Sequence, residues 1–457
     1  MKKTTCLFAL VCIQQLLAQT NPIITKWLIN STGITGRHYV AGNSTPINDA
    51  VLANVQSVQY SSNWVYMSTN GIPSYITGPF LDGNPSLATA QNAIFKLPLV
   101  PQPNTGTPTA TTGGNIGQFI NGVALFDYRD GVAWNSTTNS LCGGLPGMSP
   151  CPGGPATTQA WNRDAVVAEK NGFDCAKAHP ANGNYHHHQN PSAFNLDLTV
   201  ISTVCNLYPA DGLYVINASA HSPLLGFAAD GYPIYGAYAY TNTDGSGGIS
   251  RMKSSYQLRN MTSRTTSPTG ATVASGPAVS TQYPLGYFKE DYEFVAHPSD
   301  PTYLDVHNGR FCVTPEYPAG IYAYFTTVDA NHNSTYPYAV GPTFYGIKNA
   351  SKVTSITETT TTYTPDLAST TFQAPENNML VYPNPATEFI AVQLGQLVPV
   401  NQTVELIDTL GRVVASTQIA QGSTLCYFDT TTLYNGVYFV RTQSGKALQS
   451  VQVIISK

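Results

Sequence analysis

The stretch that decides the fold spans residues 221–236 and reads His221-Ser-Pro-Leu-Leu-Gly-Phe-Ala-Ala-Asp-Gly-Tyr-Pro-Ile-Tyr-Gly236. Asp230-Gly231 is a tight-turn signal, because Gly adopts a positive φ at no steric cost and Asp bonds to the backbone ahead of it. Tyr232 and Tyr235 flank Pro233 and form an aromatic corner. The stretch therefore predicts a β-hairpin with packed Tyr rings.

Short runs with β-like alternation recur through residues 21–350. They are Ser57 to Tyr60, Trp64 to Met67, Ile116 to Tyr128, Leu213 to Ile216 and Gly320 to Phe325. Pro/Gly-rich connections such as Pro98 to Gly117 separate them, and only Ala160 to Lys170 has helical spacing. These patterns predict a mainly β protein with a large β-rich domain over residues 98–350. Residues 21–97 form either its first strands or a separate small β region.

The composition excludes several classes of protein. Gly (38) and Pro (32) are too frequent for coiled coils or long helical bundles. A hydrophobic content of 42% excludes wholesale disorder. Only 10% of the residues are charged and the formal net charge is −4, so the basic surface of a nucleic-acid-binding protein is missing.

Residues 1–20 have the pattern of a secretory signal peptide. Lys2 and Lys3 form a short cationic head, and an apolar run from Cys6 to Ile13 follows. We expect cleavage between Ala18 and Thr20. The alternative is an N-terminal membrane anchor, although the run is shorter than the roughly 20 residues that span a bilayer. No other segment has the length and apolar character of a transmembrane helix, so none is expected in the mature chain.

The composition changes twice towards the C-terminus. Residues 351–378 are rich in Thr and predict a linker. Residues 379–457 then contain seven short β-like runs, which predict a small β-sandwich.

This tail carries three motifs at its strand and turn positions: Tyr382-Pro-Asn-Pro-Ala-Thr387, Asp408-Thr-Leu-Gly-Arg412 and Asn435-Gly-Val-Tyr-Phe439. With them it resembles the C-terminal sorting domain (type A) of the type IX secretion system of Bacteroidota. The resemblance implies recognition of residues 379–457 by that secretion machinery and export across the outer membrane. It also implies that the cargo is secreted or held on the cell surface, usually after the tail is removed. The alternative is an ordinary β-sandwich binding module.

Titratable residues concentrate in Gly172-Phe-Asp-Cys-Ala-Lys-Ala-His-Pro-Ala-Asn-Gly-Asn-Tyr-His-His-His-Gln-Asn-Pro191. If Asn184 to Gln189 is a strand, His186 and His188 point to one face, and Tyr185 and His187 to the other. Two imidazoles on one face can chelate a transition metal such as Cu, Zn or Fe. Asp174 or His179 is a candidate third ligand across a turn at Gly183. The alternative is a solvated His-rich turn without a specific site.

Three further residues are candidate partners of this site. Asp230 is a candidate acceptor for a metal-bound His. His307 is a candidate ligand, although an Asp305–Arg310 ion pair is the preferred interpretation of its turn, and His221 is a further alternative. The remaining histidines, His38, His297 and His332, are isolated and are interpreted as structural or exposed.

Six cysteines remain after the signal peptide, which is consistent with an oxidising compartment. Cys142 and Cys151 flank a Gly/Pro loop, and Cys175 and Cys205 bracket the His-rich stretch. Both pairs are plausible disulfides. Cys312 and Cys426 fall in different predicted domains, which makes their pairing doubtful.

Several ordered motifs between Pro98 and Gly346 together resemble the YHYH-domain proteins. They are Asn121-Gly-Val-Ala-Leu-Phe126, Asp174-Cys175 with His179, Tyr185-His-His-His188, Gly226 to Gly236, Asp305 to Arg310 and Thr314 to Pro318. The eponymous Tyr-His-Tyr-His reads Tyr-His-His-His here, so His187 replaces the second Tyr. The two His at spacing two are kept. The resemblance implies a motif and no established reaction.

Three functions therefore compete at this point. The chain is a secreted metal-binding protein, a metal-dependent enzyme with Asp174, Glu169 or Asp230 as base, or a surface binding or adhesion protein without metal. A Ser nucleophile elbow, a P-loop and a dinucleotide fingerprint are all missing from the sequence. Catalytic residues are not identified by the sequence.

Overall fold

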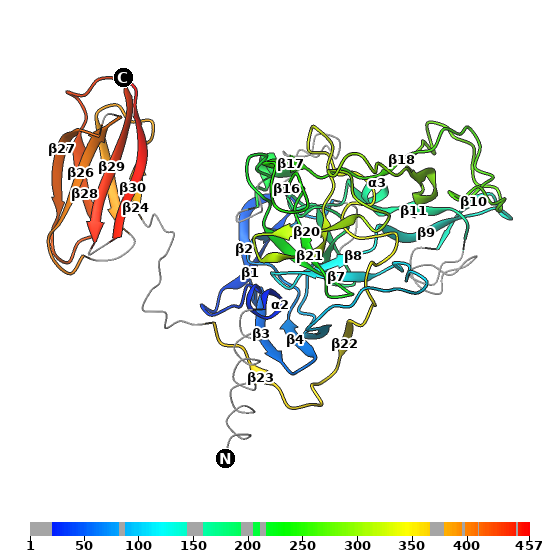
Figure 1. The fold of residues 1–457 in the computed structure, drawn as a ribbon. Coiled ribbons are helices and arrows are strands. Elements are labelled where there is room, and N and C mark those ends of the chain that lie inside the picture. The colour runs from blue at the N-terminus through cyan, green and yellow to red at the C-terminus, as the bar shows by residue number, and fades with distance from the viewer. Residues whose placement is uncertain are drawn as a thin grey trace, which may run out of the picture. The chain divides into compact units, whose positions relative to one another are not determined.

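The computed structural model describes residues 21–81, 87–143, 159–192, 204–210, 216–365, 379–394, 398–409, 411–444 and 447–457. The chain forms two compact units, residues 1–365 and 366–457. Of the described residues, 43% are in strands and 4% in helices, and no described helix reaches seven residues. The predicted mainly β fold is therefore confirmed (Figure 1).

An eight-stranded sheet forms the centre of the first unit. Its strand order is β12-β13-β8-β7-β14-β15-β21-β20. The strands are β7 (Asn115–Phe119), β8 (Ala124–Phe126), β12 (Ala178–Ala181), β13 (Asn184–His187), β14 (Leu224–Ala228), β15 (Pro233–Tyr235), β20 (Gly309–Thr314) and β21 (Tyr317–Phe325). Strands β14 and β15 form the predicted hairpin, and Gly231 in its turn has a φ of 88°. Both strands are buried along their whole length, since they lie in the middle of the sheet.

A five-stranded sheet combines the two ends of the first unit. Its order is β22-β6-β4-β3-β23. The strands are β3 (Val55–Tyr60), β4 (Trp64–Thr69), β6 (Ala93–Pro98), β22 (Ser351–Val353) and β23 (Thr361–Thr362). Ile23, Val58 and Leu97 from the N-terminal region share one core with Phe227 and Phe325. Residues 21–97 thus pack within the same compact unit as the rest of the β-rich region.

The Thr-rich segment differs from the expected linker over its first part. Strand β22 pairs with β6, and β23 pairs with β3. The side chains of β23 are exposed, so this strand is held by backbone hydrogen bonds, which need no apolar side chain. Thr also favours strands because it is β-branched. Residues 366–378 lie outside the described residues.

The described residues of the first unit also form four smaller sheets and several short helices. The strands are β1 (Thr35–Val40), β2 (Asn43–Leu52), β5 (Ile76–Thr77), β9 (Arg129–Asn135), β10 (Ser140–Gly143), β11 (Asn162–Asp164), β16 (Tyr238–Tyr240), β17 (Ile249–Arg251), β18 (Tyr256–Leu258) and β19 (Tyr292–Phe294). The helices are α2 (Pro22–Thr25), α3 (Ala165–Glu169), α4 (Val204–Leu207) and η3 (Lys289–Asp291). The expected strand Leu213 to Ile216 lies mostly outside the described residues.

The expected helix from Ala160 to Lys170 is shorter than predicted. Residues 162–164 form β11, and only Ala165–Glu169 are helical. Asp164 caps this helix, because its side chain accepts hydrogen bonds from the backbone N–H groups of Val166 and Val167. This cap sets the first residue of the helix, and the periodicity of the sequence alone does not show that position.

The second unit contains seven strands in its described part, in two sheets with one shared core. The sheet orders are β24-β25-β28 and β27-β26-β29-β30. The strands are β24 (Met379–Tyr382), β25 (Phe389–Leu394), β26 (Gln402–Asp408), β27 (Val413–Ile419), β28 (Leu425–Asp429), β29 (Gly436–Ser444) and β30 (Ala447–Ile455). This arrangement matches the predicted β-sandwich.

Covalent links are described for three cysteines. Cys175 and Cys205 form a disulfide, which confirms that pairing. Cys142 is also disulfide-bonded, and its expected partner Cys151 lies outside the described residues. Cys312 and Cys426 are free buried thiols in different units. No helix in the described residues has the length and apolar character needed to cross a membrane.

Candidate metal-binding site

The β12–β13 hairpin at the end of the eight-stranded sheet carries the His-rich stretch. His179 on β12 pairs with His186 on β13, and Gly183 in the turn has a φ of 79°. On its other side β13 runs parallel to β8, where His186 pairs with Ala124. The hairpin thereby places His179 and His186 directly opposite one another.

Strand alternation separates the three consecutive histidines as predicted. The Nε2 atoms of His186 and His188 lie 3.1 Å apart on one face. On the other face, Nε2 of His187 lies 2.9 Å from the hydroxyl of Tyr75. His179, His186 and His188 are 6%, 2% and 4% exposed, and one ligand atom from each lies within 4.8 Å of the others. The structure thus brings together three of the four expected ligands.

The tautomers of two histidines follow from their backbone contacts. Nδ1 of His186 lies 2.8 Å from the carbonyl oxygen of Asn184, and Nδ1 of His188 lies 2.6 Å from that of Asp127. Because a carbonyl only accepts, both Nδ1 atoms carry the proton. In the neutral rings both Nε2 atoms then present lone pairs, and these face one another. Such lone pairs repel unless a proton or a cation lies between them.

Glu169, the last residue of α3, adds a carboxylate to the cluster. Its Oε2 lies 3.2 Å from Nε2 of His179 and 3.4 Å from Nε2 of His188. Burial raises the pKa of Glu169, but the neighbouring His179 and His188 outweigh burial and hold this pKa below its usual value. Burial, followed by the charges of His188 and His179, lowers the pKa of His186 well below its usual value. Neutral His186 and ionised Glu169 are the forms that bind metals.

An aromatic shell fixes the orientation of these rings. Phe126 stacks on His186 with ring centroids 4.0 Å apart. Phe173 contacts both His179 and His188. The side chain of Glu169 is 24% exposed, whereas its Oε2, the oxygen that faces the histidines, is buried. Three imidazoles and one carboxylate match the ligand types and number of a tetrahedral transition-metal site.

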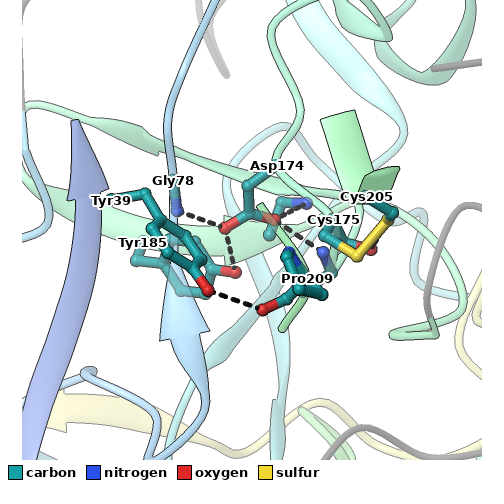
Figure 2. The surroundings of a disulfide bond; sticks show 9 residues. Tyr39, Gly78, Asp174, Cys175, Tyr185, Cys205 and Pro209 are labelled. Atoms are coloured by element: carbon teal, nitrogen blue, oxygen red, sulfur yellow. Dashed lines mark hydrogen bonds between the residues drawn. A yellow bond between two sulfur atoms is a disulfide. The ribbon is translucent and has the colours of Figure 1, made fainter. Parts of the chain in front are cut away.

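Asp174 does not join the cluster, contrary to the expectation, because both of its carboxylate oxygens accept hydrogen bonds from other groups (Figure 2). One carboxylate oxygen accepts hydrogen bonds from Gly78 N and the Tyr185 hydroxyl. The other accepts from Ala176 N and Ala178 N. Burial raises the pKa of Asp174 to about 7. Asp174 therefore stabilises the turn before β12, next to the Cys175–Cys205 disulfide.

The three alternative partners also lie outside the cluster. Asp230 accepts hydrogen bonds from the Tyr324 hydroxyl and Gly346 N. Nδ1 of His307 lies 2.7 Å from Oγ1 of Thr343. His221 contacts the carbonyl of Ser222 through Nδ1.

The prediction of an ion pair between Asp305 and Arg310 is wrong. Arg310 donates to the backbone carbonyls of Thr241, Pro301 and Tyr240. Asp305 instead accepts from the Tyr322 hydroxyl. The two residues are close in sequence, but their side chains have separate sets of partners.

The isolated histidines have side-chain contacts outside the cluster. Nδ1 of His38 lies 2.7 Å from Oδ1 of Asp49, His297 stacks on Tyr303, and Nε2 of His332 lies 3.1 Å from the Tyr238 hydroxyl.

The sequence pointed to Glu169 only as a possible base. Its place at the end of the helical segment was the available signal, but its approach to the histidines depends on packing.

Two family models match the chain. The family described as YHYH protein matches residues 94–337, and the secretion system C-terminal sorting domain matches residues 380–457. No curated protein matches this chain. The first match covers more than half of the chain and includes the whole His cluster. The second shows a type IX sorting tail, which indicates export to the cell surface or the extracellular space. The chain therefore belongs to the YHYH protein family and carries a C-terminal type IX sorting domain.

Proposed function

We propose that this exported protein binds one transition-metal ion through His179, His186 and His188, with Glu169 as the fourth ligand. The sorting domain delivers the metal-binding unit outside the cell. Zinc and copper are the metals that best suit three imidazoles and one carboxylate.

The 3.1 Å approach of the His186 and His188 Nε2 atoms carries this proposal. Two nitrogens bound about 2.0–2.1 Å from one tetrahedral ion lie roughly 3.3 Å apart, which is close to the observed separation. Each Nδ1–H is committed to a backbone carbonyl, the usual arrangement that orients a metal-ligating imidazole. A bound cation removes the lone-pair repulsion that the apo arrangement contains.

Four side-chain ligands favour binding over catalysis. Structural zinc sites are closed by four protein ligands, whereas catalytic sites keep a position for water or substrate. With Glu169 as a ligand the site is closed. A metal-dependent enzyme at this site needs Glu169 to leave the metal, and an adhesion protein needs no metal.

Elemental mass spectrometry on untagged mature protein, purified without metal-affinity columns, tests the proposal. We expect about one equivalent of zinc or copper per chain after loading and dialysis. His186→Ala/His188→Ala should lose the metal. His297→Ala, which alters a histidine outside the cluster, should retain it.

Thermal unfolding of the same samples separates metal loss from misfolding. A wild-type protein that folds with the same transition temperature whether or not metal is offered, and that retains none, contradicts the proposal. The His cluster is then a structural turn. A retained metal together with chelator-sensitive hydrolysis of a test substrate replaces the closed-site proposal by the enzyme alternative.

A further inference from the structure

A cleft of about 340 Å³ lies between the five-stranded and eight-stranded sheets of the first unit. One wall is formed by residues of β4, β6 and β22, and the other by residues of β7, β8 and β13. Its size falls within the range of small-molecule sites, about 300–1,000 Å³. Phe126 lines the cleft and also stacks on His186, so the cleft adjoins the His cluster.

Gln118 gives this cleft a polar group without a partner. Gln118 is one of the residues that line the cleft, and it is only 3% exposed. Neither its Nε2 nor its Oε1 has a hydrogen-bond partner among the described residues. A buried amide that lacks both bonds destabilises the fold, so it is normally paired with protein, water or a ligand. A group that offers one donor and one acceptor side by side, such as another amide, satisfies both atoms.

The remaining lining combines apolar residues, the polar residues Thr69, Gln91, Asn115 and Asn184, and two lysines. Phe95, Leu97 and Phe126 supply apolar surface. Lys348 and Lys352 are exposed, and none of the residues that line the cleft is acidic. This charge distribution favours a ligand that carries an anionic group next to an apolar one.

We propose that the cleft binds an amino acid that is acylated at its nitrogen and has an apolar side chain, either free or as the C-terminal residue of a peptide. Its amide pairs with Gln118, its carboxylate faces Lys348 and Lys352, and its side chain packs against Phe95 and Leu97. Binding does not require the metal, because the cleft residues and the proposed metal ligands are different side chains.

Calorimetric titration of the full chain with N-acetyl-L-phenylalanine tests the proposal, in parallel with and without chelator. We expect saturable binding of one equivalent in both conditions. N-acetyl-L-phenylalaninamide lacks the charge and 3-phenylpropanoate lacks the amide, and each should bind at least about tenfold more weakly. The tetrapeptide Gly-Gly-Gly-Phe distinguishes the two sources, because equal binding indicates a peptide end and weaker binding a free acylated amino acid.

Three variants complete the test. Gln118→Met should bind about tenfold or more weakly, yet unfold at the same or a higher temperature, because it removes an unpaired buried amide. Lys348→Gln/Lys352→Gln should abolish the preference for the acid over the amide, and Lys26→Gln, outside the cleft, should keep it. Absence of saturable binding at millimolar concentration overturns the proposal. Wild-type affinity in Gln118→Met also overturns the proposal. If Gln118→Met fails to fold, an unchanged preference for the acid over the amide in Lys348→Gln/Lys352→Gln overturns the proposal instead.

Discussion

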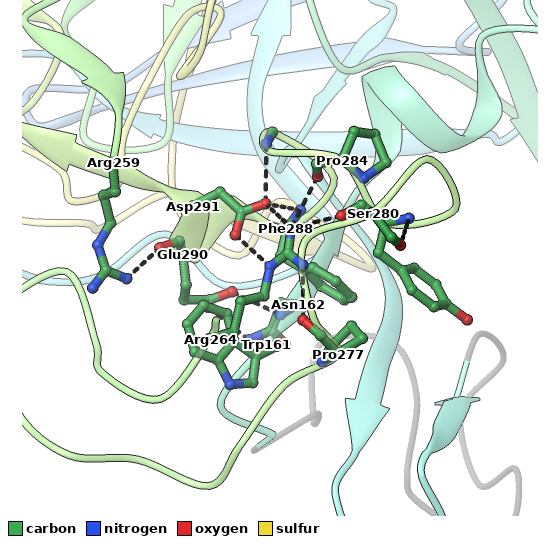
Figure 3. Close-up of polar contacts among 12 residues, drawn as sticks. Trp161, Asn162, Arg259, Arg264, Pro277, Ser280, Pro284, Phe288, Glu290 and Asp291 are labelled. Carbon is green, nitrogen blue, oxygen red and sulfur yellow. Dashed lines mark hydrogen bonds and ion pairs between the residues drawn. The ribbon is translucent and has the colours of Figure 1, made fainter. Parts of the chain in front are cut away.

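Two buried polar clusters of the first unit differ in how completely their groups are paired. Arg264 and Asp291 are fully buried and form a two-armed ion pair (Figure 3). Arg264 also donates to the carbonyls of Pro277, Tyr283 and Pro284, and Asp291 accepts from Gly286 N and Phe288 N.

The three histidines of the His cluster are also buried, but the Nε2 atoms of His186 and His188 face one another instead of complementary groups. Oε2 of Glu169 is buried and lies 3.2 Å and 3.4 Å from Nε2 of His179 and His188, but it has no hydrogen-bond partner among the described residues. Burial is therefore common to both clusters, and only the incomplete pairing points to a ligand. A cluster whose hydrogen-bond donors and acceptors are all paired stabilises the fold without a bound ligand.

Removing Arg264 should produce the largest effect on stability. Arg264→Met leaves the Asp291 carboxylate buried without its partner, which costs about 3–5 kcal/mol of the free energy of unfolding. Urea unfolding followed by Trp fluorescence measures it, because all four Trp lie in the first unit. Arg264→Met/Asp291→Leu should recover most of the loss. A loss below about 1 kcal/mol in the single variant contradicts the structural role of this ion pair.

Substitution of Asp174 should give the next largest effect on stability, and this effect should depend on pH. Burial raises its pKa to about 7 from an unfolded value of 3.8. Between these values the folded state binds one more proton than the unfolded state, so this contribution to stability is full below pH 3.8 and is lost as the pH rises to about 7.

Asp174→Asn removes this titration. Its stability should change between pH 4.5 and 7.5 by about 3 kcal/mol less than that of the wild type. Asp244→Asn is the matched control. The hydrogen bonds from Ser246 lower the pKa of exposed Asp244, so its carboxyl group does not titrate in this range. Equal pH slopes in Asp174→Asn and wild type indicate that Asp174 is ionised throughout.

Glu169→Gln should have the smallest effect and should act on metal affinity alone. The amide keeps the shape of the side chain but is a poorer metal ligand, so we expect zinc affinity to fall about 10–100-fold. Zinc titration into chelator-treated protein measures it, with Glu293→Gln as control. The apo variant should unfold at nearly the same temperature as the wild type, since Glu169 is partly exposed. Unchanged zinc affinity removes Glu169 from the proposed ligand set.

Local sequence patterns predicted much of the fold and part of the site. Alternation placed the strands around Ser57, Trp64 and Gly320, and the Asp230-Gly231 turn placed a hairpin. The same period of two separated His186 and His188 from His187, because neighbouring side chains in a strand point to opposite faces. These features depend on neighbours in the sequence, which is why sequence reasoning found them.

Longer-range contacts account for the differences. Asp174 lies close to the histidines in sequence, but its oxygens are taken by Gly78, Tyr185 and the following turn. Arg310 and Asp305 are five residues apart, and each finds partners on other elements. Thr361 and Thr362 belong to a linker-like composition, yet the edge of β3 provides backbone partners for them.

The sequence by itself determined the mainly β class, the sorting tail and the shared face of His186 and His188. These follow from composition, local periodicity and motifs, which are properties of the chain read in order. Only the tertiary structure decided that Glu169 reaches His179 and His188 while Asp174 does not, and that Gln118 lies unpaired beside a cleft. The physical reason is that every buried polar group takes the partners that folding brings within about 3 Å, and those partners come from distant segments of the chain.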